Sequence, residues 1–145
     1  LSGVLSTTSD GQGDWTLSVP SFGLANGEYT YQLKYVDVAG NEKTVDGVFV
    51  FDNSIDLSAS LQSTTAVVDG TTYTNVDRPV FSGTGNAGDR VEITITRLSP
   101  AYSQTLSTDV LDNGTWSVTS DVIALDGDYT WSAIASDVAG NTRAV

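Results

Sequence analysis

Apolar and polar residues alternate with a period of two along much of this chain. Three stretches show the alternation most clearly: residues 15–19, residues 29–35 and residues 91–96. In each of them, aromatic or aliphatic side chains occupy every second position, and polar side chains lie between them. This pattern is typical of strands with one buried face. No stretch has the 3.6-residue period of an amphipathic helix, so the chain is predicted to be all-β.

Turn signals separate the predicted strands at short intervals. Asp-Gly or Asn-Gly pairs stand at residues 10–11, 26–27, 113–114 and 126–127, among other places. Asn-Gly at 113–114 predicts a tight hairpin, because both residues of such a turn tolerate positive φ. Strands of this length and spacing favour a β-sandwich of about seven strands. By the same logic, the Gly-rich segment 83–88 is predicted to be a turn before a strand rather than a dinucleotide-binding loop, which requires a helix to follow.

The chain also repeats itself. Asp-Val-Ala-Gly-Asn occurs at residues 37–41 and again at residues 137–141, an offset of 100 positions. Tyr29 and Tyr129 occupy matching positions at the start of alternating strands, as expected of the tyrosine corners of such sandwiches. Trp15 and Trp116 likewise begin matching strands, so both are predicted to lie in a core. A period of this size is typical of small domains in tandem.

Matching the two copies predicts the domain boundaries. Residues 53–145 contain a nearly complete domain that lacks most of its last strand, whereas residues 1–52 match only the C-terminal half of that unit. With no initiator Met, the sequence is expected to be an internal piece of a longer chain. A half-sandwich has unpaired strand edges, and these favour self-association or pairing with another chain.

Composition narrows the function. The 145 residues contain no Cys and no His, which excludes disulfides, thiol or imidazole catalysis and the usual zinc sites. The net charge of −12 disfavours nucleic acid and anionic membranes as partners, and no apolar run is long enough to span a bilayer. Fifteen of the 18 acidic residues are Asp, a turn former and a frequent Ca²⁺ ligand. Because these Asp residues lie in turns rather than among apolar neighbours, no enzyme is expected.

Five motifs in order resemble those of a known family. They are Pro79–Thr84, Gly88–Val91, Gly114–Val118, Leu125–Thr130 and Asp137–Asn141. Together they resemble the bacterial Ig-like domains that occur in tandem in giant adhesins exported by type I secretion. The resemblance implies an all-β fold of tandem immunoglobulin-like Greek-key β-sandwiches, the first present only as its C-terminal half. It implies a secreted or cell-surface location and neighbouring Ig-like domains of the same chain as partners. It also implies an extended rod whose domain junctions are stiffened by Ca²⁺.

The residues themselves offer a candidate Ca²⁺ site. In such a sandwich, the turn between the last two strands lies at the end where the chain enters the domain. Side-chain oxygens from that turn, from the linker before the second domain and from the segment before residue 79 are therefore expected to meet there. Ca²⁺ takes six to eight oxygen ligands, some of them from water and backbone carbonyls. The candidate ligands are Asp52, Asn53, Asp56, Asp77, Asp137 and Asn141. Asp37 and Asn41, their counterparts in the first copy, are expected to form only an incomplete site.

Simpler interpretations remain open for these residues. Asp137 and Asn141 are also expected where a tight turn hydrogen-bonds its own backbone, and Asp52 and Asp56 suit an ordinary solvated linker. The sequence thus predicts a Ca²⁺-rigidified structural spacer in a cell-adhesion protein. The alternative is a binding module that contacts host glycan or a host receptor directly.

Overall fold

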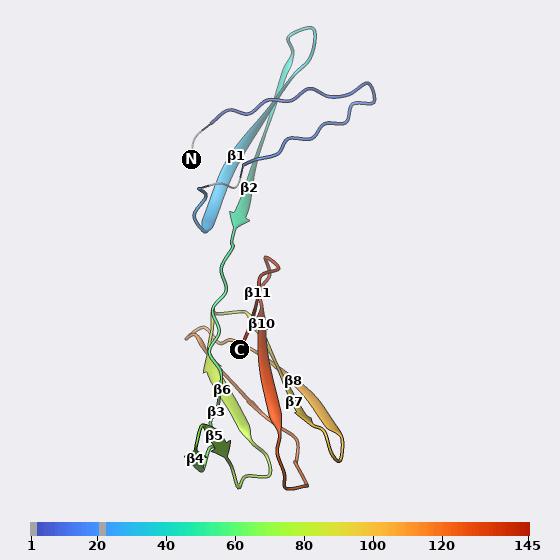
Figure 1. The fold of residues 1–145 in the computed structure, drawn as a ribbon. Helices are drawn as coiled ribbons and strands as arrows, with labels where there is room; N and C mark the ends of the chain where they lie inside the picture. The colour runs from blue at the N-terminus through green and yellow to red at the C-terminus, as the bar shows by residue number, and fades with distance from the viewer. Residues whose placement is uncertain (1–2, 21–22) are drawn as a thin grey trace. The chain divides into compact units, whose positions relative to one another are not determined.

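The computed structural model describes residues 3–20 and 23–145, and the chain divides into two units, Leu1–Asp52 and Asn53–Val145 (Figure 1). All regular structure in the described residues is β-strand, as the alternation predicts. The described residues contain no apolar helical segment that could span a bilayer.

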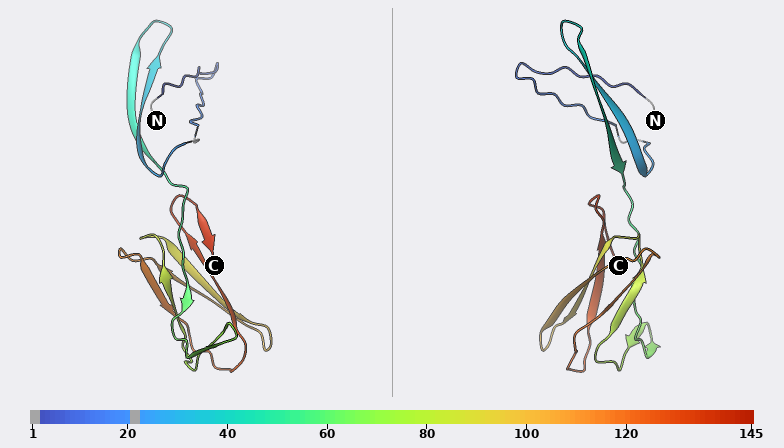
Figure 2. Two further views of the ribbon diagram at one scale, coloured as in Figure 1. Left: turned by 60° about the vertical axis from the view of Figure 1, so that its left-hand side comes forward. Right: turned by 180° about the vertical axis from the view of Figure 1, so that it is seen from behind.

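The second unit is a two-layer sandwich (Figure 2). One sheet has the order β3-β6-β9, formed by Ser60–Leu61, Val80–Thr84 and Thr115–Thr119. The other has the order β11-β10-β7-β8, formed by Thr142–Ala144, Thr130–Ser136, Arg90–Arg97 and Tyr102–Asp109. All neighbours pair antiparallel. The seven strands confirm the predicted immunoglobulin-like β-sandwich.

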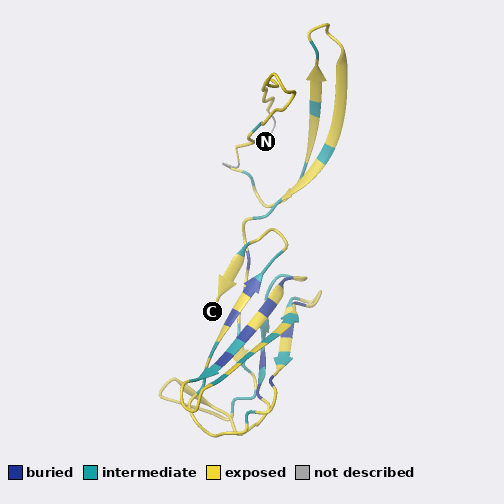
Figure 3. Cartoon of the chain, turned by 90° about the vertical axis from the view of Figure 1, so that its right-hand side faces the viewer, coloured by how far each residue is buried: buried dark blue, intermediate teal, exposed yellow. Residues whose placement is uncertain are grey.

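The core lies between these two sheets and follows directly from the alternation. On β7, the side chains of Val91, Ile93 and Ile95 are at most 1% exposed, while the residues between them face outward. The facing sheet contributes Phe81 and Trp116, each 2% exposed. Figure 3 shows this alternation of buried and exposed residues along the strands. One contiguous apolar layer thus holds the second unit together.

The turn at Asn113 and Gly114 differs from the prediction. Gly114 has a φ of 77°, so the tight turn is present, but the strands on either side belong to different sheets. β8 pairs with β7, whereas β9 pairs with β6. The hairpin prediction therefore holds only for the turn itself, where the N–H of Leu111 donates to the carbonyl oxygen of Thr115 at 2.9 Å, while the strands beyond it pair with different partners.

Both predicted tyrosine corners are present. The hydroxyl of Tyr129 donates a hydrogen bond to the carbonyl oxygen of Leu125 at 2.9 Å, and Tyr29 donates to Ala25 at 2.8 Å. In the second unit, Arg97 adds a bond from Nη1 to the Tyr129 hydroxyl at 3.0 Å. These bonds fix the chain just before the β10 strand and, in the first copy, before the β1 strand.

A small hairpin is inserted between β3 and β6. It consists of β4 (Ala66–Val68) and β5 (Thr71–Tyr73), which form a two-stranded sheet of their own. Its turn, Asp69-Gly70, has φ values of 49° and 81°, the geometry that an Asp-Gly hairpin signal predicts. Every residue of both strands is exposed.

The regular structure of the first unit is a single long hairpin. β1 (Gly27–Val36) pairs with β2 (Glu42–Phe51) over ten residue pairs, and the described residues before it form no strand. Trp15 is 49% exposed, so the prediction that it lies in a core is wrong. The local pattern around Trp15 is that of a buried strand, but the described part of this unit holds no second sheet to cover it.

Candidate functional site

The turn Asp137–Asn141 joins β10 to β11 and is closed by the side chains of its first and last residues. Oδ1 of Asp137 accepts a hydrogen bond from the Asn141 backbone N–H at 2.8 Å, and Oδ2 accepts one from Nδ2 of Asn141 at 2.7 Å. Gly140 has a φ of 90°, which favours glycine at this position. The simpler interpretation of these residues, a turn that bonds to its own backbone, is therefore present in the structure.

The first unit contains the same turn at Asp37–Asn41. Oδ1 of Asp37 accepts from the backbone N–H of Asn41 at 2.8 Å and from that of Ala39 at 2.9 Å. Oδ2 accepts from Nδ2 of Asn41 at 2.8 Å. The two copies thus share one geometry despite their different surroundings, which shows that the five-residue sequence determines the turn locally.

The hydrogen bonds of the turn also lower the pKa of its aspartate. The Nδ2–H of Asn141, together with backbone N–H groups of the turn, lowers the pKa of Asp137 below its ordinary value. The same partners in the first unit lower the pKa of Asp37. A lowered folded-state pKa means that each carboxylate stabilises the fold at neutral pH, and this contribution is lost as the pH falls through the folded pKa.

We expect Asn141→Ala to raise the pKa of Asp137 toward the ordinary value of about 4, because the largest cause of the shift is removed. Titration of the Asp137 carboxyl carbon by NMR measures this shift. Asp37 is the internal control, since its own partner, Asn41, is unchanged. An unchanged Asp137 midpoint would mean that the backbone donors alone hold the charge.

The Asp137–Asn141 turn lies at the leading end of the second unit, which is the end where residues 53–57 enter the sandwich. Leu57 forms a bridge with Gly85 just beyond β6, and Arg90 at the start of β7 pairs with Ser136 at the end of β10. Residues 55–57 and the Asp137–Asn141 turn therefore lie at one end of the sandwich, as the sequence predicts (Figure 1). Asp56, which is exposed, belongs to this end.

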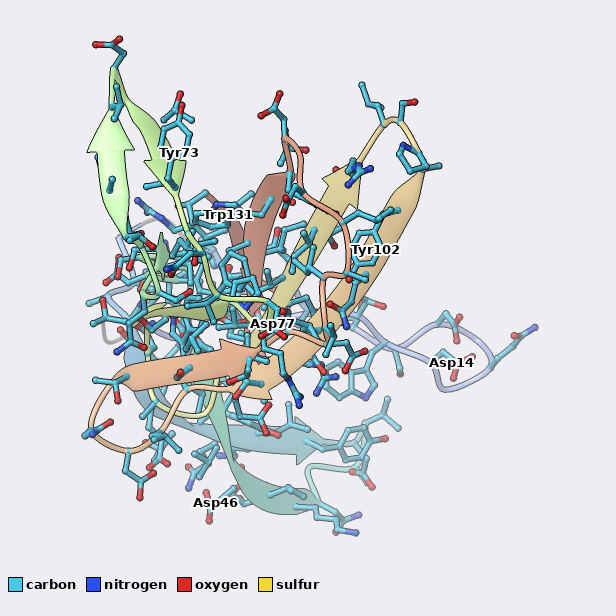
Figure 4. The ribbon with its side chains drawn as sticks, turned by 90° about the horizontal axis from the view of Figure 1, so that it is seen from below. Asp14, Asp46, Tyr73, Asp77, Tyr102 and Trp131 are labelled. Atoms are coloured by element: carbon cyan, nitrogen blue, oxygen red, sulfur yellow. The ribbon has the colours of Figure 1, made fainter. Side chains whose placement is uncertain are left out.

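Asp77 does not belong to it. Its carbonyl oxygen accepts a hydrogen bond from Ile123, and the next strand pairs Val80 with Thr119 at the end of β9. β6 then runs the length of its sheet before it reaches Gly85, so Asp77 lies at the trailing end of the unit (Figure 4). The expectation that Asp77 reaches the leading end is wrong, because β3 and β6 pair antiparallel and β6 therefore begins at the end where β3 finishes.

Two further candidates, Asp52 and Asn53, lie on the segment that leads into the second unit. Asp52 follows β2 and accepts a hydrogen bond from Nδ2 of Asn26 at 2.7 Å. Asn53, the next residue, is exposed. Asp37 and Asn41 lie at the other end of the β1–β2 hairpin from Asp52, because Gly27 pairs with Phe51 and Val36 with Glu42.

Sequence reasoning missed other oxygen-bearing side chains at the leading end. The loop between β6 and β7 carries Asn86 and Asp89, and Asp89 is only 6% exposed. The loop between β8 and β9 adds Asp112 and Asn113. Backbone bonds from Gly85 to Gly114 and from Val110 to Asp89 tie these loops together. The sequences of these two loops resemble those of ordinary turns. Only the fold shows that the two loops lie side by side.

Across residues 3–20 and 23–145, no three acidic side chains gather closely enough to hold a metal ion. The donors present at the leading end are nonetheless hard oxygens of carboxylates and amides, the ligands that Ca²⁺ prefers. The lowered pKa of Asp137 keeps one of them ionised well below neutral pH.

Comparison with known proteins adds two findings. A family model described as a bacterial Ig-like domain matches residues 2–53 and, separately, residues 52–145. Among solved structures, the chain is similar to "tetra-tandem repeat in extending region of large adhesion protein", with 24% identity and a TM-score of 0.55. This similarity covers 94% of the present chain and 38% of that one, and it supports a shared fold. No curated protein matches the chain.

Proposed function

Because the chain belongs to the family of bacterial Ig-like domains, with one match in each unit, we propose that it is a repeat module of an extracellular bacterial adhesin. Its role in that protein is that of a structural spacer without catalytic activity, and Ca²⁺ stiffens it at the leading end of the second unit. The similarity to a tandem repeat from the extending region of a large adhesion protein supports this role.

The observation that carries the Ca²⁺ proposal is the duplicated aspartate turn. Two copies hold an aspartate and an asparagine in the same arrangement, and both aspartates have a lowered pKa. The turn holds an ionised carboxylate in a fixed position through its hydrogen bonds, and such a fixed oxygen donor suits a cation site. Asp56, Asp137 and Asn141 would hold the ion from the second unit, and Asp52 and Asn53 would contribute from the segment leading into it.

The bound ion would supply charge neutralisation for these carboxylates. Without a cation, acidic side chains repel one another, and this repulsion favours an open arrangement of residues 52–56. With the cation, the same side chains are drawn to one point and the segment loses freedom. Stiffness would then depend on the Ca²⁺ concentration, which is near millimolar outside cells, where modules of this kind bind with Kd of about 10⁻⁴–10⁻³ M.

We expect calorimetric titration of the full chain to show Ca²⁺ binding with a Kd of about 10⁻⁴–10⁻³ M. At a Ca²⁺ concentration of 100 times Kd, binding should stabilise the second unit by about 2.7 kcal/mol. Distances between spin labels placed on the two units should narrow in distribution when Ca²⁺ is added and broaden again with a chelator. Asp137→Asn should weaken binding at least tenfold, because it removes a full ligand charge.

Asp126→Asn is the matched control, because Asp126 lies before β10, at the opposite end of that strand from the Asp137–Asn141 turn. It should leave both Kd and spin-label distances unchanged. Absence of binding heat at 10 mM Ca²⁺, together with unchanged distances, would contradict the proposal. Equal weakening by both variants would assign the effect to overall charge rather than to a site.

A further inference from the structure

Asn113 and Gly114 carry a chemistry that neither the fold nor the proposed function uses. Asn113 is exposed in the loop between β8 and β9, and Gly114 follows it with a φ of 77°. The side-chain amide of asparagine is a thermolabile group, because the backbone nitrogen of the next residue attacks it. A glycine in that next position has no Cβ, so the nitrogen approaches without obstruction. The pair is therefore reactive by its sequence.

The reaction needs only base and water. The Gly114 nitrogen loses its proton and forms a bond to Cγ of Asn113, while the bond from Cγ to Nδ2 breaks and ammonia leaves. The product is a cyclic imide that contains atoms of both residues. Water then opens the imide at either carbonyl carbon. One opening gives aspartate, and the other gives isoaspartate, in which the backbone passes through the side chain and is longer by a methylene.

The folded turn occupies both groups that have to react. The N–H of Gly114 donates to the carbonyl oxygen of Leu111 at 2.8 Å. Oδ1 of Asn113 accepts from the backbone N–H of Thr115 at 3.1 Å and from its Oγ1 at 2.7 Å. The attack removes the proton of the first bond and brings Cγ onto the nitrogen, which draws Oδ1 away from Thr115. The reaction is therefore restricted to the fraction of molecules in which this turn is open.

The same turn connects two loops at the leading end of the second unit. The N–H of Gly85 donates to the carbonyl oxygen of Gly114 at 3.1 Å, and the N–H of Leu111 donates to that of Thr115 at 2.9 Å. An additional methylene between residues 113 and 114 displaces both acceptors relative to their donors. Isoaspartate at this position therefore prevents the turn from closing again, and it adds a carboxylate next to Asp112.

We propose that the Asn113-Gly114 turn is a site of intramolecular covalent modification, in which hydrogen bonds of the closed turn protect Asn113 and opening of the turn commits it to isoaspartate. The substrate is the chain itself, and the co-reactant is water. Each molecule thus carries a residue that records how long the leading end of its second unit has been open. This inference is independent of Ca²⁺ binding and of adhesion.

The test is peptide mapping by mass spectrometry after incubation of the full chain at mildly alkaline pH. Conversion of Asn113 in the folded chain should be at least about tenfold slower than in denaturing urea, because only the open turn reacts. Chains that have reacted should lose exchange protection at the Gly85 amide, whereas the amides of β10 should keep theirs. Equal conversion with and without urea, or full protection of Gly85 after conversion to isoaspartate, would overturn the proposal.

A variant pair separates the turn from overall stability. Thr115→Val removes the Oγ1 bond and keeps a β-branched residue on β9. It should speed conversion in the folded chain about threefold, the usual effect of one hydrogen bond on an equilibrium, and leave the rate in urea unchanged. Thr119→Val, at the other end of β9, is the matched control and should change neither rate.

Asn26, which also precedes a glycine, is the internal standard within each sample. It belongs to the first unit, where its Nδ2 donates to Oδ1 of Asp52 at 2.7 Å, so neither variant should alter its conversion. A folded-state rate at Asn113 that is the same in Thr115→Val as in the original chain would contradict protection by the turn. Equal acceleration at Asn113 by both variants would do so as well.

Discussion

Trp116→Ala is expected to destabilise the second unit by about 3–5 kcal/mol, the usual cost of removing a large aromatic side chain from a core. Trp116 is 2% exposed and packs between the two sheets. Its indole N–H also donates to the carbonyl oxygen of Ser58 at 3.2 Å, which ties the leading segment to β9. Since small domains are stable by only about 5–15 kcal/mol, the variant would lose a large share of the total. Urea unfolding followed by circular dichroism measures the change.

Trp15→Ala is the matched control, because Trp15 occupies the corresponding position in the first unit. At 49% exposure it has no core to leave, so its replacement should change the stability of the second unit by no more than about 0.5 kcal/mol. A loss of second-unit stability from Trp15→Ala as large as that from Trp116→Ala would contradict burial in the core as the cause of the Trp116 effect.

Gly83→Ala is expected to destabilise the second unit by about 3 kcal/mol, at the upper end of the usual cost of overpacking. A Cβ at this position would collide with the backbone carbonyl oxygen of Ser58 and would lie 2.9 Å from Cε2 of Trp116. Ser58 is held there by backbone and side-chain bonds to Thr84, so relief requires the leading segment to leave β6. Chemical unfolding and the loss of exchange protection in β6 report this change.

The contacts at two other glycines predict graded costs in the free energy of unfolding. At Gly85, an added Cβ meets Val110 at 3.1 Å and the carbonyl oxygen of Asp56 at 3.2 Å, so Gly85→Ala should cost less than Gly83→Ala. At Gly11, nothing lies within 4 Å, so Gly11→Ala should be neutral. Equal costs at residues 83 and 11 would mean that the close approach of Ser58 to β6 does not hold in solution.

Most of the second unit could be predicted from the alternation of apolar and polar residues. The stretch from Val91 to Ile95 has its apolar residues fully buried and its polar residues outward, because a strand in a sandwich has only two faces and one of them lies against the core. The tyrosine corners at Tyr29 and Tyr129 could also be predicted, because each closes a local loop of four residues that needs no long-range partner.

The errors arise where a long-range partner decides the outcome. Trp15 has the sequence environment of a core residue, but burial depends on a covering sheet that no local pattern specifies. The turn at Asn113-Gly114 could be predicted, but the sheets that its flanking strands join could not. β8 pairs with β7 and β9 pairs with β6, and both partners are far from the turn in sequence. Asp77 lies at the end opposite to the predicted one because β6, which follows it, pairs antiparallel with β3.

Only the local part of the candidate Ca²⁺ site could be predicted from the sequence. The Asp137–Asn141 turn is a local structure, and its position beside residues 55–57 follows from the order of strands in any sandwich of this type. Asn86, Asp89 and Asp112 were not predicted, since their loops meet only through bonds between segments far apart in the sequence.

The strand order of the second unit also determines how it would respond to mechanical force. Its first strand, β3, and its last, β11, lie at the edges of different sheets. Tension applied at residues 53 and 145 would pull each strand along its own axis, so that the bonds of Ser58 and Gln62 to β6, and those of Val145 to Ala133, bear the load together in shear. Hydrogen bonds that are loaded together in shear resist more force than hydrogen bonds that break one after another. The sandwich is therefore suited to transmit a pulling force through its two edge strands while its core stays closed.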